Sequence, residues 1–203
     1  MYEKLPNLVI GFHGCTKDTH RRVLVENEEL KGSYNTYDWL GNGIYFWENN
    51  LVRAWDWAKK RYGDEAAVVG AIIDLGYCLN LTDSASEQIL KDGYVELKIL
   101  CELAGLELPQ NRASKKTKDI LLRDLDCAVI QQIQFGNENL YNTDLSTVTP
   151  QFDSIRGVFI EGEAPYPGSA FFGKTHVQIC VSNPNCIKGY FEPRNRKKGY
   201  RLP

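Results

Sequence analysis

The sequence predicts an α+β protein, in which apolar strands alternate irregularly with helices. Residues 66–75 form a nearly continuous apolar run, which suits a strand buried on both faces. Residues 50–62 instead repeat apolar side chains at helical spacing. No internal repeat and no linker of disordered composition interrupts the chain. We therefore expect one domain that spans residues 1–203.

The remaining elements follow from the same patterns and from turn and cap residues. Strands are expected at residues 8–12, 44–47, 78–81, 154–160, 175–181 and 187–191. Helices are expected at residues 16–26, 86–104 and 118–134. Thr16 can cap the first of these helices, and Gly105 with Pro109 ends the second. Residues 111–118 and 137–153 are polar and are expected to be irregular.

Composition excludes few functions and favours none. The 24 basic and 26 acidic residues give a net charge of −2, so there is no general case for binding nucleic acid or a membrane. The six cysteines show no CxxC spacing, and we expect reduced, mostly buried thiols of a cytoplasmic protein. The first residues lack a secretion signal, and no apolar run reaches the roughly 18 residues of a membrane span. The three histidines fit no metal-site spacing, so no metal is expected.

The most informative stretch runs from Trp39 to Trp47, beginning as a glycine turn and ending as an aromatic strand. Gly41 and Gly43 flank an asparagine, a combination that tolerates positive φ and favours a tight turn. Glycines in front of a strand also let another backbone or a flat ligand come close. The pattern is not a dinucleotide-binding glycine motif, because a third glycine would fall at Phe46 and a strand follows where a helix is needed.

A second motif lies upstream, where His13 and Gly14 follow a short apolar strand. Together with the Gly-x-Gly-Ile-Tyr-Phe run at residues 41–46 and the aromatic helix after it, this pattern resembles the NAD-binding core of the ADP-ribosyltransferases. It is similar to the poly(ADP-ribose)-polymerase and diphtheria-toxin branch, which is identified by a His, a Tyr and an acidic residue on three strands. The resemblance covers the first 75 residues well and the last 45 loosely.

The resemblance implies a fold and a set of site residues. The fold would be ADP-ribosyltransferase-like, with two packed antiparallel or mixed sheets around an NAD⁺ cleft, flanking helices and a helical insert at residues 82–135. His13 would bind a ribose hydroxyl of NAD⁺, and Tyr45 would stack on the nicotinamide ring. A second aromatic residue is expected near Asp56, so Trp55 or Trp57 must take that place. The expected NAD⁺-binding residues are therefore His13, Gly14, Gly43, Tyr45 and Trp57.

The third strand places Gln178 where the family usually has a catalytic Glu. Glutamine can hydrogen-bond the nicotinamide ribose but cannot act as a general base. With His13 and Tyr45 as its catalytic partners, Gln178 argues against polymer elongation and favours transfer of a single unit or hydrolysis. Glu161 and Glu163 precede this strand, in the place of the substrate-recognition loop of toxin-type relatives. Either of them could activate the acceptor.

The resemblance leaves several functions open. The first is a mono-ADP-ribosyltransferase that uses NAD⁺ as co-substrate and modifies a protein or a nucleic acid. Basic residues at 115–118 and 194–201 could contact phosphates, although charged segments are commonly just solvated. The second is an NAD⁺ glycohydrolase, and the third is a non-catalytic module that binds NAD⁺ or ADP-ribose. A compact chain of this kind is similar to bacterial toxins and anti-phage defence effectors, which would imply a neutralising antitoxin or a chaperone as partner.

Each site residue also has an ordinary structural interpretation. His13 could be a histidine at a strand end, Tyr45 a core tyrosine and Trp57 a core residue of an amphipathic helix. Glu161 and Glu163 could be solvated loop charges. It is the combination of these residues with the glycines, and not any one of them, that favours an NAD⁺ site.

Overall fold

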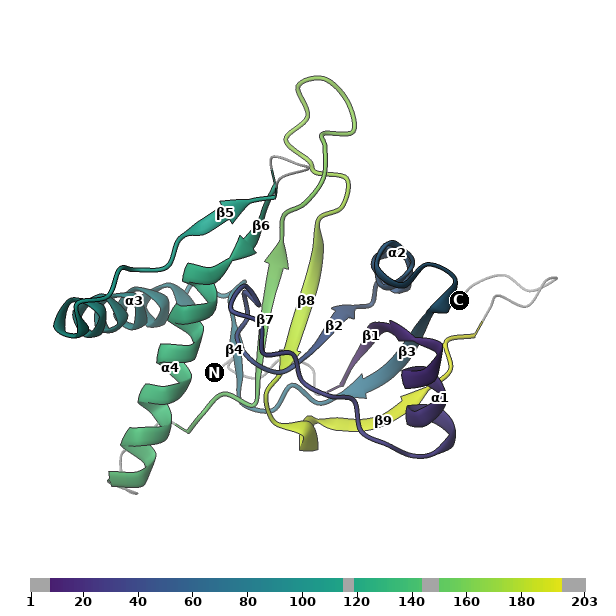
Figure 1. Cartoon of the computed structure of the whole chain (residues 1–203), viewed down its shortest axis with the longest axis horizontal. Helices are drawn as coiled ribbons and strands as arrows, with labels where there is room; N and C mark the ends of the chain where they lie inside the picture. The colour runs from purple at the N-terminus through teal and green to yellow at the C-terminus, as the bar shows by residue number, and fades with distance from the viewer. Residues whose placement is uncertain (1–7, 115–118, 144–149, 195–203) are drawn as a thin grey trace.

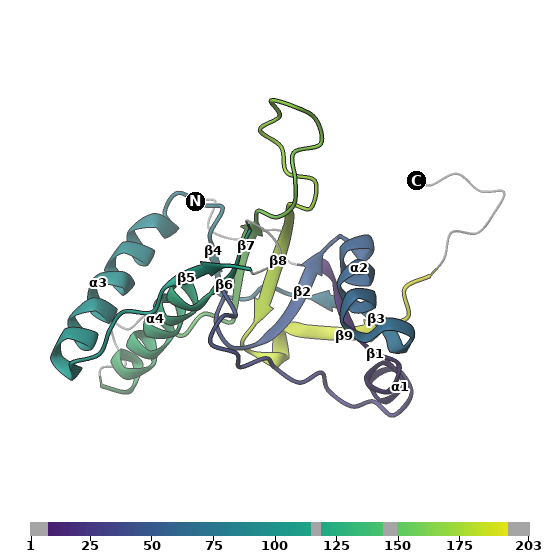
Figure 2. The same cartoon turned by 45° about the horizontal axis from the view of Figure 1, so that its top comes forward.

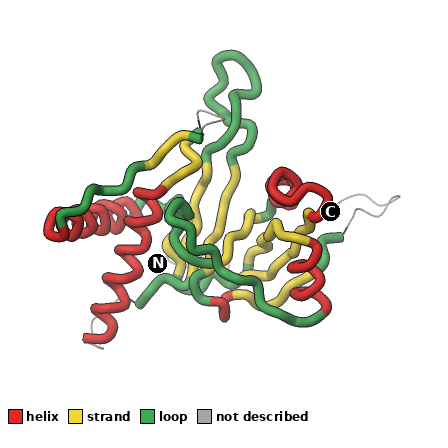
Figure 3. Tube along the Cα trace, in the orientation of Figure 1, coloured by secondary structure: helices red, strands yellow, loops and turns green. Residues whose placement is uncertain are grey.

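The computed structural model describes residues 8–114, 119–143 and 150–194, with only the backbone described at 138–143. A seven-stranded sheet has the order β4-β7-β8-β2-β1-β3-β9, and a separate hairpin pairs β5 with β6 (Figures 1 and 3). The strands are β1 Val9–Thr16, β2 Ile44–Glu48, β3 Ala66–Ile73, β4 Cys78–Asn80, β5 Asn111–Ala113, β6 Ile120–Arg123, β7 Ser154–Phe159, β8 His176–Val181 and β9 Ile187–Phe191. The helices are α1 Lys17–Val25, α2 Leu51–Tyr62, α3 Ser86–Ala104 and α4 Asp124–Thr143, with short 3₁₀ turns at Gly63–Glu65 and Pro184–Cys186.

The predicted α+β class is confirmed, and the structure has one mixed seven-stranded sheet beside a separate two-stranded one. The seven strands form one hydrogen-bonded sheet, in which β4 and β7 are parallel and the other neighbours are antiparallel. The sheet is nevertheless narrow at its middle, because β1 and β2 pair only at Gly11↔Glu48 and Phe12↔Trp47. On either side of this junction the pairing is extensive, as between β1 and β3.

Local chemistry explains why most elements begin where the sequence predicts. The Thr16 hydroxyl accepts a hydrogen bond from the amide of Thr19 at 3.2 Å, which caps α1. The Asn50 side chain accepts one from Arg53 N at 3.1 Å and caps α2 in the same way. Gly105 ends α3 in the left-handed conformation, with φ of 64°.

Three predictions around the expected insert at 82–135 are wrong in detail. The helix expected at 118–134 begins only at Asp124, after strand β6, and continues to Thr143 into the segment expected to be irregular. Its start is set by a tertiary contact, since Asn111 Oδ1 accepts hydrogen bonds from the amides of Leu125 at 3.0 Å and Asp126 at 3.3 Å. The insert contains a hairpin as well as helices, because β5 lies in the expected basic loop and β6 lies in the first turn of the expected helix. Residues 115–118 and 195–201 of the basic segments lie outside the described residues.

The helices cover different parts of the sheet (Figures 1 and 2). Helix α2 packs on β1, β2 and β3, where Ala54 and Ala58 are buried with Trp47 and Val68. Helix α1 packs against β3, β1 and β9, and its Val23 belongs to a different buried cluster. At the opposite end, α4 buries the side chains of Val129, Ile130 and Ile133 against β4, β7 and β8. Helix α3 packs on the outer side of α4.

Gly43 is expected to be essential for the register between β2 and β8. A Cβ at this position would lie 2.5 Å from the carbonyl oxygen of Val181 and 2.6 Å from Cys180 Sγ, so Gly43→Ala must push the two strands apart. We expect a loss of about 1–3 kcal/mol in the free energy of unfolding, measured by urea denaturation. Gly189→Ala is the matched control, because a Cβ at Gly189 meets nothing within 4 Å and should leave stability nearly unchanged. Equal stabilities of the two variants would contradict this packing argument.

Candidate functional site

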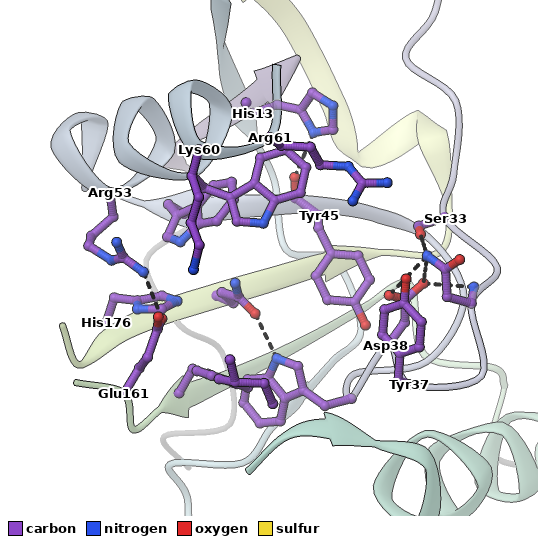
Figure 4. Close-up of a pocket in the computed structure, with 18 of the residues that line it drawn as sticks. His13, Ser33, Tyr37, Asp38, Tyr45, Arg53, Lys60, Arg61, Glu161 and His176 are labelled. Carbon is purple, nitrogen blue, oxygen red and sulfur yellow. Dashed lines mark hydrogen bonds and ion pairs between the residues drawn. The ribbon is translucent and has the colours of Figure 1, made fainter. Parts of the chain in front are cut away.

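A pocket of about 750 Å³ opens where β1 and β2 part (Figure 4). Beyond Phe12↔Trp47, β1 continues along β3 and β2 continues along β8, so His13 pairs with Val69 and Tyr45 with Cys180. Beyond that pair the backbones of the two strands are no longer hydrogen-bonded to each other, and side chains line the opening between them. Helix α2 forms one wall of the pocket and residues 31–39 form another.

His13 bridges the opening between the two strands. Its Nδ1 lies 2.8 Å from the carbonyl oxygen of Tyr45, which can only accept a hydrogen bond. We therefore assign the proton to Nδ1, which makes Nε2 an acceptor on the other side of the ring. Burial lowers the pKa of His13, and the hydrogen bond to Tyr45 opposes that shift only in part. The ring is accordingly neutral at pH 7 and presents a lone pair.

The Tyr45 hydroxyl is held by the turn that precedes its own strand. It accepts a hydrogen bond from the amide of Leu40 at 2.9 Å and donates one to the carbonyl of Gly41 at 2.9 Å. Burial raises the pKa of this hydroxyl far above its ordinary value, so it stays protonated. The aromatic ring lines the pocket in a fixed orientation, which suits stacking better than acid–base chemistry.

Gln178 lines the pocket from β8, next to β2 in the sheet. Its Oε1 accepts a hydrogen bond from the indole Nε1 of Trp39 at 2.6 Å, which fixes the orientation of the amide and leaves the Nε2 hydrogens as donors. Trp39 is itself fixed, with Arg123 4.5 Å from its ring centroid and Phe159 at 5.4 Å. The structure thus brings together His13, Tyr45 and Gln178 from three neighbouring strands.

Gly14 and Trp57 also line the pocket, where β1 meets α2. A Cβ on Gly14 would lie 2.9 Å from the carbonyl oxygen of Ala54 and 3.0 Å from Trp57 Cε3, so the glycine allows the close approach of the helix. The Trp57 ring lies 5.5 Å from that of Trp47. Of the two tryptophans expected as alternatives, Trp57 faces the pocket, whereas Trp55 packs within the apolar cluster beneath α2.

Gly43, Glu161 and Glu163 fall in three different places. Gly43 is not among the pocket residues, because it lies against β8 and its missing side chain makes room for Val181. Glu161 does line the pocket, and its Oε2 lies 2.7 Å from Nη2 of Arg53 in a largely buried ion pair (Figure 4). Glu163 lies outside the pocket and is exposed. Of the two acceptor-side candidates, only Glu161 is positioned to touch a bound molecule.

The pocket carries an excess of positive charge. Lys31, Lys60 and Arg61 line it and form no ion pair with any residue that the structure describes, although Arg61 lies 5.8 Å from the Trp57 ring centroid. The acidic residues that line the pocket are Glu161 and Asp38, and the carboxylate of Asp38 accepts a hydrogen bond from the amide of Asn35 at 2.9 Å. An anionic ligand would therefore be favoured over a neutral or cationic one.

Sequence reasoning missed several pocket residues: Lys31, Asp38, Trp39, Trp47, Arg53, Lys60, Arg61 and His176. The sequence could have indicated His176, because it stands two residues before Gln178 on a strand and its side chain therefore lies on the same face. Arg53 and Arg61 lie in the helix that supplies Trp57, but the sequence pattern drew attention only to its aromatic residues and not to its basic ones. Within the described residues, no group of three or more His, Cys, Asp or Glu side chains could hold a metal ion.

Comparison with known proteins gives little further guidance. No family model matches the chain, and no solved structure matches it significantly. An uncharacterized protein of Methanocaldococcus jannaschii is 25% identical over 188 residues, which covers 87% of this chain and 83% of the relative. The similarity thus extends over most of the length of both proteins. In the described part of the chain, no helix is both long and apolar enough to cross a membrane.

Acidification is expected to destabilise the fold through His13 and His176. Burial lowers the pKa of both rings, whereas a histidine of the unfolded chain titrates near its ordinary value of about 6.5. Below that pH the histidines of the unfolded chain bind protons, whereas those of the folded chain stay neutral. The free energy of unfolding therefore falls by up to about 1.4 kcal/mol for each histidine and each pH unit. Urea denaturation at pH 7.5 and 5.5 measures this fall. Equal values at the two pH values would contradict neutral, buried rings.

Proposed function

We propose that the protein is an NAD⁺-dependent mono-ADP-ribosyltransferase with an ADP-ribosyltransferase-like fold. One observation carries this proposal. His13, Tyr45 and Gln178 stand far apart in the sequence, yet they lie on the adjacent strands β1, β2 and β8 and line one pocket. The family that the N-terminal motif resembles is identified by side chains on three such strands. The narrow junction between β1 and β2 supports the proposed fold, because the cleft opens there.

The chemistry of each residue suits a part of NAD⁺. The Nε2 lone pair of His13 can accept a hydrogen bond from a ribose hydroxyl. The fixed ring of Tyr45 and the indole of Trp57 offer flat surfaces for the nicotinamide, and Gly14 offers a backbone without a side chain. The amide of Gln178 can hydrogen-bond the hydroxyls of the nicotinamide ribose.

Three basic residues of the pocket suit the pyrophosphate part of NAD⁺. NAD⁺ carries two negative charges on its pyrophosphate, and Lys31, Lys60 and Arg61 line the pocket without a carboxylate partner among the described residues. Charge-assisted hydrogen bonds to phosphate are among the strongest polar contacts that a protein makes. We propose NAD⁺ as the only co-substrate and no metal.

In the proposed reaction the glycosidic bond between nicotinamide and C1 of the ribose breaks. Its electron pair goes to the ring nitrogen, so nicotinamide leaves as a neutral molecule and C1 becomes electron-poor. Gln178 can orient the ribose, but as a neutral amide it stabilises the developing positive charge less than a carboxylate does. A glutamine also cannot act as a general base, which argues against polymer growth and favours transfer of a single ADP-ribose unit to a macromolecular acceptor.

Loss of the site residues should abolish the activity. We expect His13→Ala and Tyr45→Ala to reduce incorporation of ³²P from labelled NAD⁺ into a cell lysate by about 100-fold or more, because the first removes a contact to the ribose and the second removes the surface on which nicotinamide stacks. The matched controls are His20→Ala and Tyr94→Ala, which change the same residue types outside the pocket and should retain wild-type labelling. Full activity of both site variants would refute the proposal.

The same assay separates the proposed function from the two functions that the sequence leaves open. Label that protease or nuclease removes identifies transfer and the class of the acceptor. Free nicotinamide without bound label would identify a glycohydrolase. Thermal protection by NAD⁺ with neither product would leave a binding module.

A further inference from the structure

Three buried polar atoms belong to residues that line the pocket wall and make no hydrogen bond to any described residue. Among the residues that the structure describes, the buried side-chain nitrogens without a hydrogen bond are Trp47 Nε1, Arg53 Nε and His176 Nε2. All three residues line the pocket, although they come from β2, α2 and β8. Buried polar groups without a partner are rare in native proteins and costly to maintain. Their convergence on one pocket marks a subsite that a polar group of a ligand completes.

The three atoms have complementary hydrogen-bonding roles. Trp47 Nε1 and Arg53 Nε carry hydrogen and can only donate. His176 differs, because its Nδ1 lies 2.7 Å from the carbonyl oxygen of Lys174 and must donate to it. In the neutral ring Nε2 is therefore an acceptor. Two donors and one acceptor suit a hydroxyl group, which both accepts and donates hydrogen bonds.

The surroundings of His176 keep it neutral. Its ring is only 6% exposed and lies 5.6 Å from the Phe159 ring and 6.1 Å from the Trp47 ring. Burial lowers its pKa most, and Arg53 of α2 lowers it further, whereas the hydrogen bond to the Lys174 carbonyl and the charge of Glu161, just after β7, raise it in part. Glu161 itself pairs with Arg53 at 2.7 Å, so its carboxylate is already engaged. His176 thus offers the unengaged base on this wall (Figure 4).

His176 also lies beside the proposed reaction centre. It stands two residues before Gln178 on β8, so both side chains project from the same face of the strand. Their Cα atoms are about 7 Å apart along an extended strand. A group bound at His176 therefore approaches the ribose that Gln178 orients in the proposed function.

We propose that His176 is the general base for a hydroxyl acceptor, a serine or threonine of a protein, bound by Trp47, Arg53 and His176. This inference rests on the proposed function. The acceptor oxygen forms a bond to C1 of the ribose as the bond from C1 to nicotinamide breaks. The hydroxyl proton passes to Nε2 of His176, and the electron pair of the broken bond leaves with nicotinamide.

The acceptor class follows from the base and from the segment that leads to it. A guanidinium has only N–H donors, so it cannot accept the hydrogen bonds that Trp47 Nε1 and Arg53 Nε offer, and a carboxylate acceptor needs no base. Residues 160–175 connect β7 to His176 and contain one Lys and two Glu, so the segment lacks the positive charge that nucleic-acid binding requires. It exposes Tyr166, Phe171 and Phe172, which suits contact with a protein.

The first test measures the fate of ADP-ribose in the wild type and in three variants. Methanol serves as a minimal hydroxyl acceptor, with methyl ADP-ribose as its product, and a cell lysate supplies protein acceptors. His176→Gln should lower both products by about 100-fold or more, while NAD⁺ still raises its Tm as in the wild type. Trp47→Phe, which removes one donor, should lower them about tenfold. His20→Gln is the matched control and should behave as the wild type.

Two readouts do not depend on how well the variants fold. The wild-type rate should fall about tenfold per pH unit below a pKa lower than 6.5, because protonated His176 cannot act as a base. Long-range ¹H–¹⁵N spectra of the wild type should show Nε2 of His176 unprotonated at pH 7.5. A proton on Nε2 at that pH would overturn the assignment without any activity measurement.

The outcomes separate this inference from the proposed function. A His176→Gln enzyme with the rate and pH profile of the wild type would overturn the base and leave the transferase intact. Label that hydroxylamine releases as from an ester, or that nuclease removes, would overturn the serine or threonine acceptor. A wild type that releases no nicotinamide would overturn the proposed function and this inference with it.

Discussion

The hydrogen bond between His13 and the main chain of Tyr45 lies where the architecture changes. Up to Phe12 and Trp47 the sheet is continuous, and beyond that pair β1 and β2 follow different neighbours. The ring of His13 spans the opening at 2.8 Å and replaces the ladder bond that the strands no longer make. Without this hydrogen bond, β1 and β2 would face each other beyond Phe12 and Trp47 as two unpaired strand edges. The pocket exists because the strands part, and it keeps its shape because the ring ties them together.

The helical half of the molecule takes part in the same arrangement. Gly41, whose carbonyl receives the Tyr45 hydroxyl, lies against Ile130 of α4, where a Cβ would approach Cγ2 to 2.8 Å. The Thr36 hydroxyl donates to Asp124 at the start of α4 at 2.8 Å. The loop that carries Trp39 is therefore braced by a helix that comes more than 80 residues later in the chain. This explains why residues 82–135 cannot be regarded as an appendage, even though no functional motif falls within them.

The sequence predicts a good part of this structure, and the limits have physical causes. Strand periodicity, the glycines that end elements and the cap at Thr16 are local signals, so they place most elements within a few residues. The start of α4 depends on Asn111, which acts on amides 14 and 15 residues away, and no local pattern reports it. His13, Tyr45 and Gln178 could be chosen from their motifs. Arg53 and Glu161 could not be paired in advance, because they stand 108 residues apart and meet only through the fold.

Both pocket histidines have their tautomer fixed by a carbonyl of the main chain, from Tyr45 for His13 and from Lys174 for His176. A side-chain partner would be lost with a single substitution, whereas a peptide carbonyl is present whatever residue occupies the position. A substitution of Lys174 therefore leaves the proton of His176 on Nδ1. Divergent descendants of this chain can change the residues around the pocket, and hence what they recognise, while inheriting both lone pairs unaltered.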